Sequence, residues 1–133
     1  MKRRKFVFYT LVAATIIAVP FAAYRRYSDS FVRAIGEPAF LTNVCDDNTI
    51  RSIGVTYRAR NPEEAKVDKL MPLLLGTCGE SPDRSHSEAD YNRLIQKLDA
   101  AVRDDYTDGR VVNINGWVLS LTEARQCALY SLR

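Results

Sequence analysis

An uncharged apolar segment near the N-terminus is the feature that most constrains how this chain can fold. Residues 6–23 read FVFYTLVAATIIAVPFAA, with MKRRK before them and YRRY after them. As an α-helix, this segment would extend roughly 27 Å, close to the roughly 30 Å of a bilayer's hydrocarbon core. It therefore predicts one N-terminal transmembrane helix, and it divides the chain into a signal or anchor segment, residues 1–27, and a single body, residues 28–133.

The basic head carries a second signal. Arg3, Arg4 and Phe6 match the core of the twin-arginine export pattern, which a receptor reads, although Lys2 and Val7 depart from the full pattern. Two outcomes stay open, retention as an anchor and removal as a signal peptide. The length of residues 6–23 and the poor cleavage sites around Phe21 favour retention.

The positive charge is larger before the apolar segment than after it, which places the head in the cytoplasm. The interpretation is a single-pass protein of the bacterial inner membrane, in contact with lipid through residues 6–23 and with its body on the periplasmic side.

The net charge of +3 belongs to the leader rather than to the body. Residues 1–27 hold six of the 19 basic residues and none of the 16 acidic ones, so the body carries 13 basic and 16 acidic residues, a net −3. Without a basic stripe, the body gives no support for nucleic-acid binding. Its length of about 105 residues suits one hydrophobic core.

Apolar residues of the body recur at intervals of three and four, which is typical of amphipathic helices. The pattern predicts helices over 28–36, after Asp46 or Asp47, over 61–75 with Pro72 bending or shortening it, and from Ser87 toward Gly109. Residues 39–44 are interpreted as an apolar connector, and Gly54 as a point of close packing. The predicted fold class is mainly α.

The C-terminal tail predicts the remaining elements. Asn115-Gly116 is a turn dipeptide, so at most one short β-hairpin is expected near 111–119. Ser120 and Glu123 fit a capping box, in which each side chain accepts from the other residue's backbone N–H, and they predict a final helix. Trp117 and Tyr130 are candidate interface residues, because Trp and Tyr anchor many interfaces. The alternative for Trp117 is a core position.

Three cysteines leave one without a partner. If the body is exported, Cys45 and Cys78 are a possible disulfide that encloses 32 residues and contributes roughly 3–4 kcal/mol. Cys127 lies at a helical core position. The alternative is three free buried thiols.

No catalytic constellation assembles from the sequence. The chain has no GxGxxG, P-loop or HExxH pattern, and its one histidine, His86, has no nucleophile motif nearby. Asp104 and Asp105 are interpreted as a solvated helix face. We therefore expect no catalytic, cofactor-binding or metal-binding residues, and we expect that the protein is not an enzyme.

Residues 116–129, GWVLSLTEARQCAL, resemble the closing pattern of a group of small twin-arginine leader proteins, and residues 50–57 and 62–64 belong to the same resemblance. In leader, size and helical class, the chain is loosely similar to the small subunits of membrane flavin dehydrogenases, the gluconate 2-dehydrogenase subunit 3 type. That resemblance implies a larger partner, an FAD-dependent oxidoreductase of the glucose-methanol-choline type. It implies no FAD-binding position in this chain.

The predicted function is a non-catalytic, membrane-anchored, envelope-facing accessory subunit that exports or tethers this larger oxidoreductase. The alternative is a structural subunit of another membrane protein complex with no redox role. A free periplasmic enzyme is a third interpretation, and it lacks a nucleophile and base pair.

Overall fold

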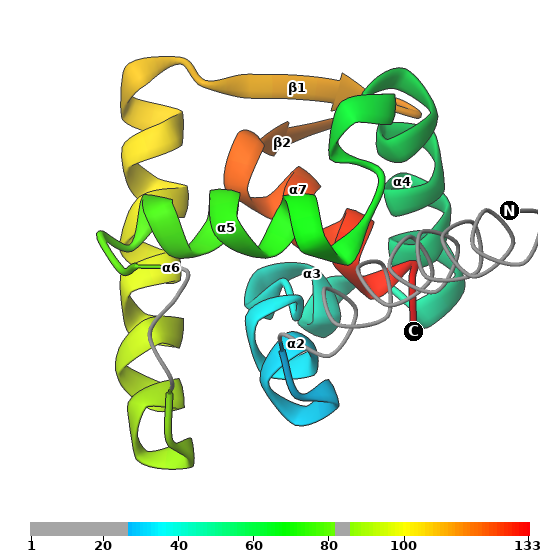
Figure 1. Ribbon diagram of the computed structural model, residues 1–133. Coiled ribbons are helices and arrows are strands. Elements are labelled where there is room, and N and C mark those ends of the chain that lie inside the picture. Colours follow the sequence, from blue (N-terminus) through cyan, green and yellow to red (C-terminus); the bar gives the residue numbers. More distant parts are fainter. Residues whose placement is uncertain (1–26, 82–85) are drawn as a thin grey trace, which may run out of the picture.

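The computed structural model describes residues 27–81 and 86–133 (Figure 1). This part of the chain forms helices and one antiparallel hairpin. In chain order the elements are α2 (Asp29–Ile35), α3 (Ala39–Val44), α4 (Asp47–Arg60), the 3-10 helix η1 (Pro62–Glu64), α5 (Val67–Thr77), α6 (Glu88–Asp108), β1 (Val111–Ile114), β2 (Trp117–Ser120) and α7 (Leu121–Tyr130).

The last helix, α7, is the centre of the domain. It contacts α2, α4, α5 and α6 and both strands. Figure 1 shows α6 along one side of it and α4 along the other, with α5 crossing it. Eight of the ten residues of α7 are buried. A helix covered on nearly all sides has to bury its polar residues as well, and these require partners within the fold.

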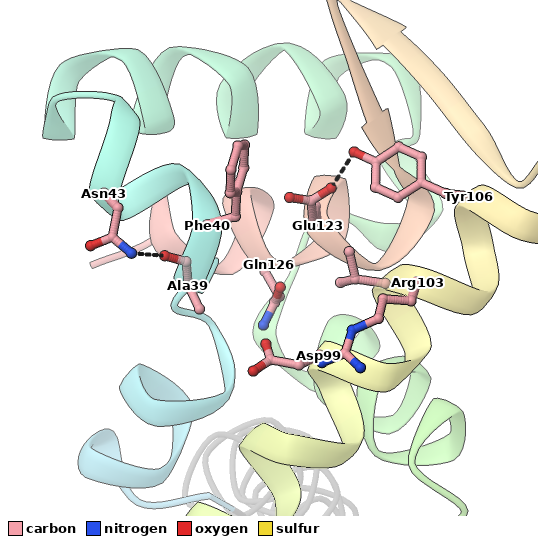
Figure 2. Close-up of a pocket in the computed structure, with 9 residues that line it drawn as sticks. Ala39, Phe40, Asn43, Asp99, Arg103, Tyr106, Glu123 and Gln126 are labelled. Carbon is pink, nitrogen blue, oxygen red and sulfur yellow. Dashed lines mark hydrogen bonds between the residues drawn. The ribbon is translucent and has the colours of Figure 1, made fainter.

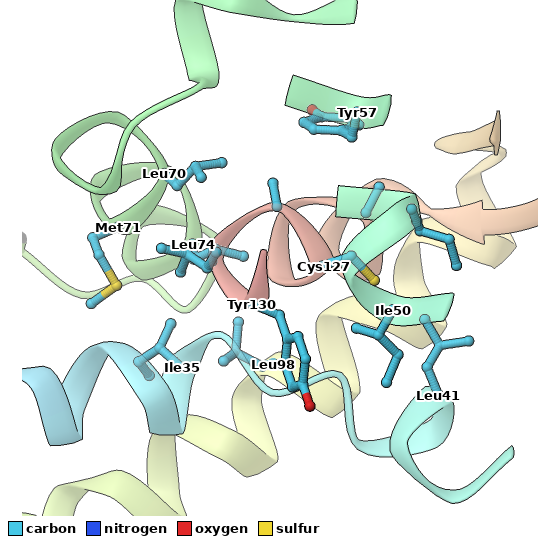
Figure 3. Close-up of a cluster of buried hydrophobic side chains, with 14 of the residues drawn as sticks. Ile35, Leu41, Ile50, Tyr57, Leu70, Met71, Leu74, Leu98, Cys127 and Tyr130 are labelled. Carbon is cyan, nitrogen blue, oxygen red and sulfur yellow. The ribbon is translucent and has the colours of Figure 1, made fainter. Parts of the chain in front are cut away.

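The hydrophobic core surrounds α7 and draws on every α-helix described. Figure 3 shows part of this cluster, including Ile35, Leu41, Ile50, Tyr57, Leu70, Met71, Leu74, Leu98, Cys127 and Tyr130. Burying one Leu or Ile side chain of this kind contributes about 1.5–3 kcal/mol relative to leaving it exposed.

Two glycines allow helices to approach α7 closely. A Cβ atom at Gly54 would lie 2.0 Å from the carbonyl oxygen of Cys127, and one at Gly36 would lie 2.8 Å from the Cβ of Leu129. Because these contacts involve backbone or the base of a side chain, a larger residue has no room. The close packing predicted for Gly54 is confirmed.

The hairpin lies where the sequence places it. Val111 pairs with Ser120 and Ile114 with Trp117 in an antiparallel register. Asn115 and Gly116 both have positive φ, 53° and 86°, which is the requirement of a type I′ turn that matches the twist of the strands.

The predicted fold class is wrong in its first part, the transmembrane helix. Among residues 27–81 and 86–133, no helix has the length and apolar character needed to cross a membrane. Residues 6–23, together with Arg3, Arg4 and Phe6, lie outside the described residues. The structure is that of a mainly helical domain with one small hairpin.

Two local predictions also need correction. The helix expected over 61–75 is divided into η1 and α5, with extended backbone at Lys66 between them, because Glu64 turns inward to buried partners described below. Pro72 does not end α5, which continues to Thr77. Residues 39–44, expected as a connector, form the short helix α3.

Candidate functional site

A groove of about 570 Å³ opens between α3, α6 and α7 (Figure 2). Three helices far apart in the sequence contribute to it. The residues that line it are Ala39, Phe40 and Asn43 from α3, Asp99, Val102, Arg103 and Tyr106 from α6, and Glu123 and Gln126 from α7.

Phe40 forms one edge of the groove and is unusually exposed for its size. Its side chain is 66% exposed, whereas its neighbour Leu41 is 1% exposed and enters the core. The short helix is held by its own side chains, since Asn43 Nδ2 donates to the carbonyl oxygen of Ala39 at 3.1 Å. A fixed helix therefore presents an aromatic ring to solvent beside the groove.

Glu123 lies at the floor of the groove and begins α7. Its Oε1 accepts from the backbone N–H of Ser120 at 3.2 Å, and the Ser120 hydroxyl accepts from the Glu123 N–H at 3.0 Å. The predicted capping box is confirmed. The same oxygen accepts from the Tyr106 hydroxyl at 2.6 Å. Burial, and then this hydrogen bond, raise the pKa of Tyr106 to about 12.

Gln126 ties the floor of the groove to the N-terminal helices. Its Nε2 donates to the carbonyl oxygens of Ile35 at 3.1 Å and Glu37 at 3.3 Å, and its side chain is buried. These bonds fix the turn between α2 and α3 against α7, so they set where Phe40 stands relative to α6.

Asp99 and Arg103 carry the charges of the α6 wall. They are one helical turn apart, but neither side chain forms an ion pair or hydrogen bond with any described residue. Figure 2 shows the Asp99 carboxylate pointing toward Gln126.

Asp105 corrects the interpretation of Asp104 and Asp105 as a solvated pair. It is buried, and it accepts from the Thr122 N–H and from Arg110 Nε, both at 2.9 Å. Burial alone would raise the pKa of the Asp105 carboxyl, but these hydrogen bonds outweigh it and hold that pKa below its ordinary value. Asp105 thus serves as a second cap for α7.

A partly buried ion pair lies on another side of α7. Glu64 Oε1 accepts from Arg125 Nε, and its Oε2 accepts from the Tyr57 hydroxyl, each at 2.7 Å. Burial and the bond to Glu64 raise the pKa of Tyr57 well above its ordinary range. The pair fastens η1 and α4 to α7, which is a structural role.

The two predicted interface residues lie in different environments. Trp117 is 37% exposed and lines a smaller hollow of about 240 Å³ with α4 residues that include Thr49 and Ser52, so it is not a core plug. Tyr130 is buried: its hydroxyl donates to Asp47, and the guanidinium of Arg133 lies 4.1 Å from its ring centroid. Tyr130 therefore acts inside the fold, and the structure does not bring it together with Trp117 in one site.

The predicted disulfide between Cys45 and Cys78 is not formed. All three cysteines of the chain are free thiols. The Cys78 thiol is buried against the Leu94 carbonyl oxygen of α6, whereas Cys45 ends α3. Burial raises the pKa of Cys78 to about 11 and that of Cys127 to about 12, which suits core thiols.

His86 packs against an aromatic ring, that of Phe31. Its ring centroid lies 5.1 Å from that of Phe31. Within the described ranges, no cluster of three or more His, Cys, Asp or Glu side chains is arranged to hold a metal ion.

Sequence reasoning missed most of the groove. Phe40 falls within residues 39–44, which the sequence predicts as a connector, and Tyr106 is not singled out by any motif. The one available signal was that Phe40 and Leu41 are adjacent, because a helix that buries one of two adjacent large residues tends to expose the other.

Comparison with known proteins does not assign this chain to a family. The chain matches no protein-family model, no curated protein and no solved structure. The resemblance to twin-arginine proteins and to flavin dehydrogenase small subunits stays a prediction.

Proposed function

We propose that this protein is a non-catalytic, envelope-facing accessory subunit that docks a larger oxidoreductase through the groove between α3, α6 and α7. The observation that carries the proposal is Phe40, a large aromatic side chain 66% exposed beside a groove of about 570 Å³. Aromatic side chains at hollows are the usual anchors of protein interfaces, because they bury much apolar area at little entropic cost.

The buried carboxylates support a role without chemistry of its own. Asp105 and Glu64 are each engaged on both oxygens by structural partners, and Glu123 caps α7 through one oxygen. A general acid or base needs a carboxyl group in reach of a substrate. Asp105 and Glu64 instead hold a helix end and a cross-helix contact.

The oxidoreductase partner and the envelope location come from the sequence. Arg3, Arg4 and Phe6 match the twin-arginine core, and residues 116–129 carry the family resemblance. The twin-arginine route moves folded proteins, so it suits a subunit whose partner has already bound its flavin.

Native co-purification tests the proposal. The full chain, tagged at its C-terminus, is expressed in its source cells, and co-eluting proteins are identified by mass spectrometry and flavin absorbance. We expect one larger flavoprotein with the wild-type chain. Phe40→Ser should reduce its recovery at least tenfold, because the substitution removes an exposed anchor without touching the core.

Trp117→Ser is the matched control, since Trp117 is an exposed aromatic residue beside a different hollow. It should leave partner recovery unchanged. Recovery of the chain as a lone monomer would sink the accessory role. Loss of the partner with Trp117→Ser but not with Phe40→Ser would move the docking surface away from the groove.

A further inference from the structure

The floor of the groove holds acceptor atoms that the fold does not use. Glu123 is 3% exposed and Gln126 is 5% exposed, and both line the groove. Glu123 Oε2 and Gln126 Oε1 accept no hydrogen bond from residues 27–81 or 86–133. Figure 2 shows the second oxygen of Glu123 pointing away from Tyr106, toward Phe40. Neither oxygen is sealed away from solvent, so a group that enters the groove can donate to both.

The α6 side of the groove adds a second negatively charged acceptor, the carboxylate of Asp99. The Asp99 carboxylate lies below Gln126 in Figure 2 and forms no ion pair within the described residues. Two carboxylates thus border the groove against one guanidinium, that of the exposed Arg103. Aromatic rings stand on both sides, Phe40 from α3 and Tyr106 from α6.

We infer that the groove recognises a basic side chain, a lysine or arginine, that the partner presents next to an apolar residue. The free oxygens in the groove can only accept hydrogen bonds, and the charged groups of Lys and Arg only donate them, so the two are complementary. Asp99, Glu123 and Gln126 would accept from the basic group, and the apolar neighbour would pack on Phe40. An acidic side chain here would face carboxylates at close range, so the same groups exclude it. This inference rests on the proposed function and names the chemistry of its partner.

Arg103 gives the inference a second consequence. It is one turn from Asp99 and carries the only positive charge among the lining residues, so it opposes a bound cation. Neutralising Asp99 should therefore weaken binding of a basic group, and neutralising Arg103 should strengthen it.

A peptide titration tests this directly. The probes are acetyl-Leu-Arg-Leu-amide and the same peptide with citrulline, an uncharged isostere, in place of arginine. Both are titrated into the purified, 15N-labelled full chain and followed by NMR. We expect the arginine peptide to shift the amides of Phe40, Asp99 and Gln126, and to bind about tenfold more tightly than the citrulline peptide.

Three variants sharpen the result. Asp99→Asn should weaken the arginine peptide at least threefold and leave the citrulline peptide unchanged, whereas Arg103→Gln should strengthen the arginine peptide. Asp104→Asn, an exposed carboxylate on the same helix that does not line the groove, is the matched control and should change neither. Equal affinity for the two peptides, or shifts confined to another face, would overturn the inference.

The co-purification assay separates this inference from the proposed function. If Phe40→Ser loses the flavoprotein but Asp99→Asn keeps it in full, docking at the groove stands and recognition of a basic group is wrong. If no larger protein elutes with the wild-type chain, the proposed function itself fails.

Discussion

Two adjacent aspartates on α6 have opposite roles. Asp104 is exposed, while Asp105, one residue on, is buried and caps α7 through the Thr122 N–H. One step along a helix turns a side chain by about 100°, so neighbours of identical chemistry enter different environments. The pKa of Asp105 is lowered because hydrogen bonds from Thr122 and Arg110 stabilise its ionised form in the folded protein.

Asp105→Asn should therefore destabilise the protein in a pH-dependent way. Because the folded-state pKa of Asp105 lies below its unfolded value of about 3.9, the carboxylate stabilises the fold above about pH 4. That contribution is lost as the pH falls through the folded pKa. We expect Asp105→Asn to lower the free energy of unfolding by about 1–3 kcal/mol at pH 7, and the difference from wild type to shrink by pH 3. Urea unfolding at pH 7, 5 and 3 measures this.

Asp104→Asn serves as the control, because it removes the same charge from an exposed position. It should change the free energy of unfolding by less than about 0.5 kcal/mol at each pH. If the two variants behave alike, Asp105 is not the cap that the structure assigns.

Among the elements, the pairing of α4 with α7 most constrains the architecture. At Gly54 the backbones come so close that the α7 carbonyl of Cys127 occupies the place of a side chain. The short distance between the α4 and α7 backbones lets α7 lie at the centre, with α2, α4, α5 and α6 around it. It also makes the position intolerant of even one methyl group.

Gly54→Ala should lower the free energy of unfolding by about 3 kcal/mol, since a backbone atom cannot move aside as a flexible side chain can. Gly76→Ala is the matched control: it also lies in a helix, α5, and a Cβ there would meet nothing within 4 Å. It should raise the free energy of unfolding by about 0.5–1 kcal/mol. Guanidinium denaturation reports both values, and an unaffected Gly54→Ala would contradict the close approach.

For the whole molecule, the core rather than a covalent link holds the N-terminal helices to the rest. Cys78 and Cys127 are buried, Cys45 is half-buried, and all are free. The groove then depends on non-covalent ties such as Gln126 to Ile35, across 91 residues.

Alkylation of the native protein at pH 8 should consequently label Cys45 first. Burial raises the pKa of Cys78 to about 11 and that of Cys127 to about 12, so both have little thiolate at this pH, as well as poor access. Iodoacetamide followed by mass spectrometry measures this, and all three should react in guanidinium. A Cys45–Cys78 peptide in a non-reducing digest would contradict the free thiols.

Local sequence signals predicted the local structure well. The capping box of Ser120 and Glu123 and the Asn115-Gly116 turn were both identifiable, because each depends on interactions within a few residues. The division of the 61–75 helix was not, because Glu64 contacts Arg125, 61 residues away. The groove was missed for the same reason.

The sequence by itself determined the starts of α2, α4, α6 and α7, the hairpin and the apolar stripes, since periodicity and capping act over one or two turns. Only the tertiary structure decided that Asp105 is a cap, that Tyr130 is internal, and that Phe40 stands beside Asp99 and Gln126. Those outcomes arise where helices remote in sequence meet, and a buried polar group takes whichever partner the packing brings within hydrogen-bonding distance.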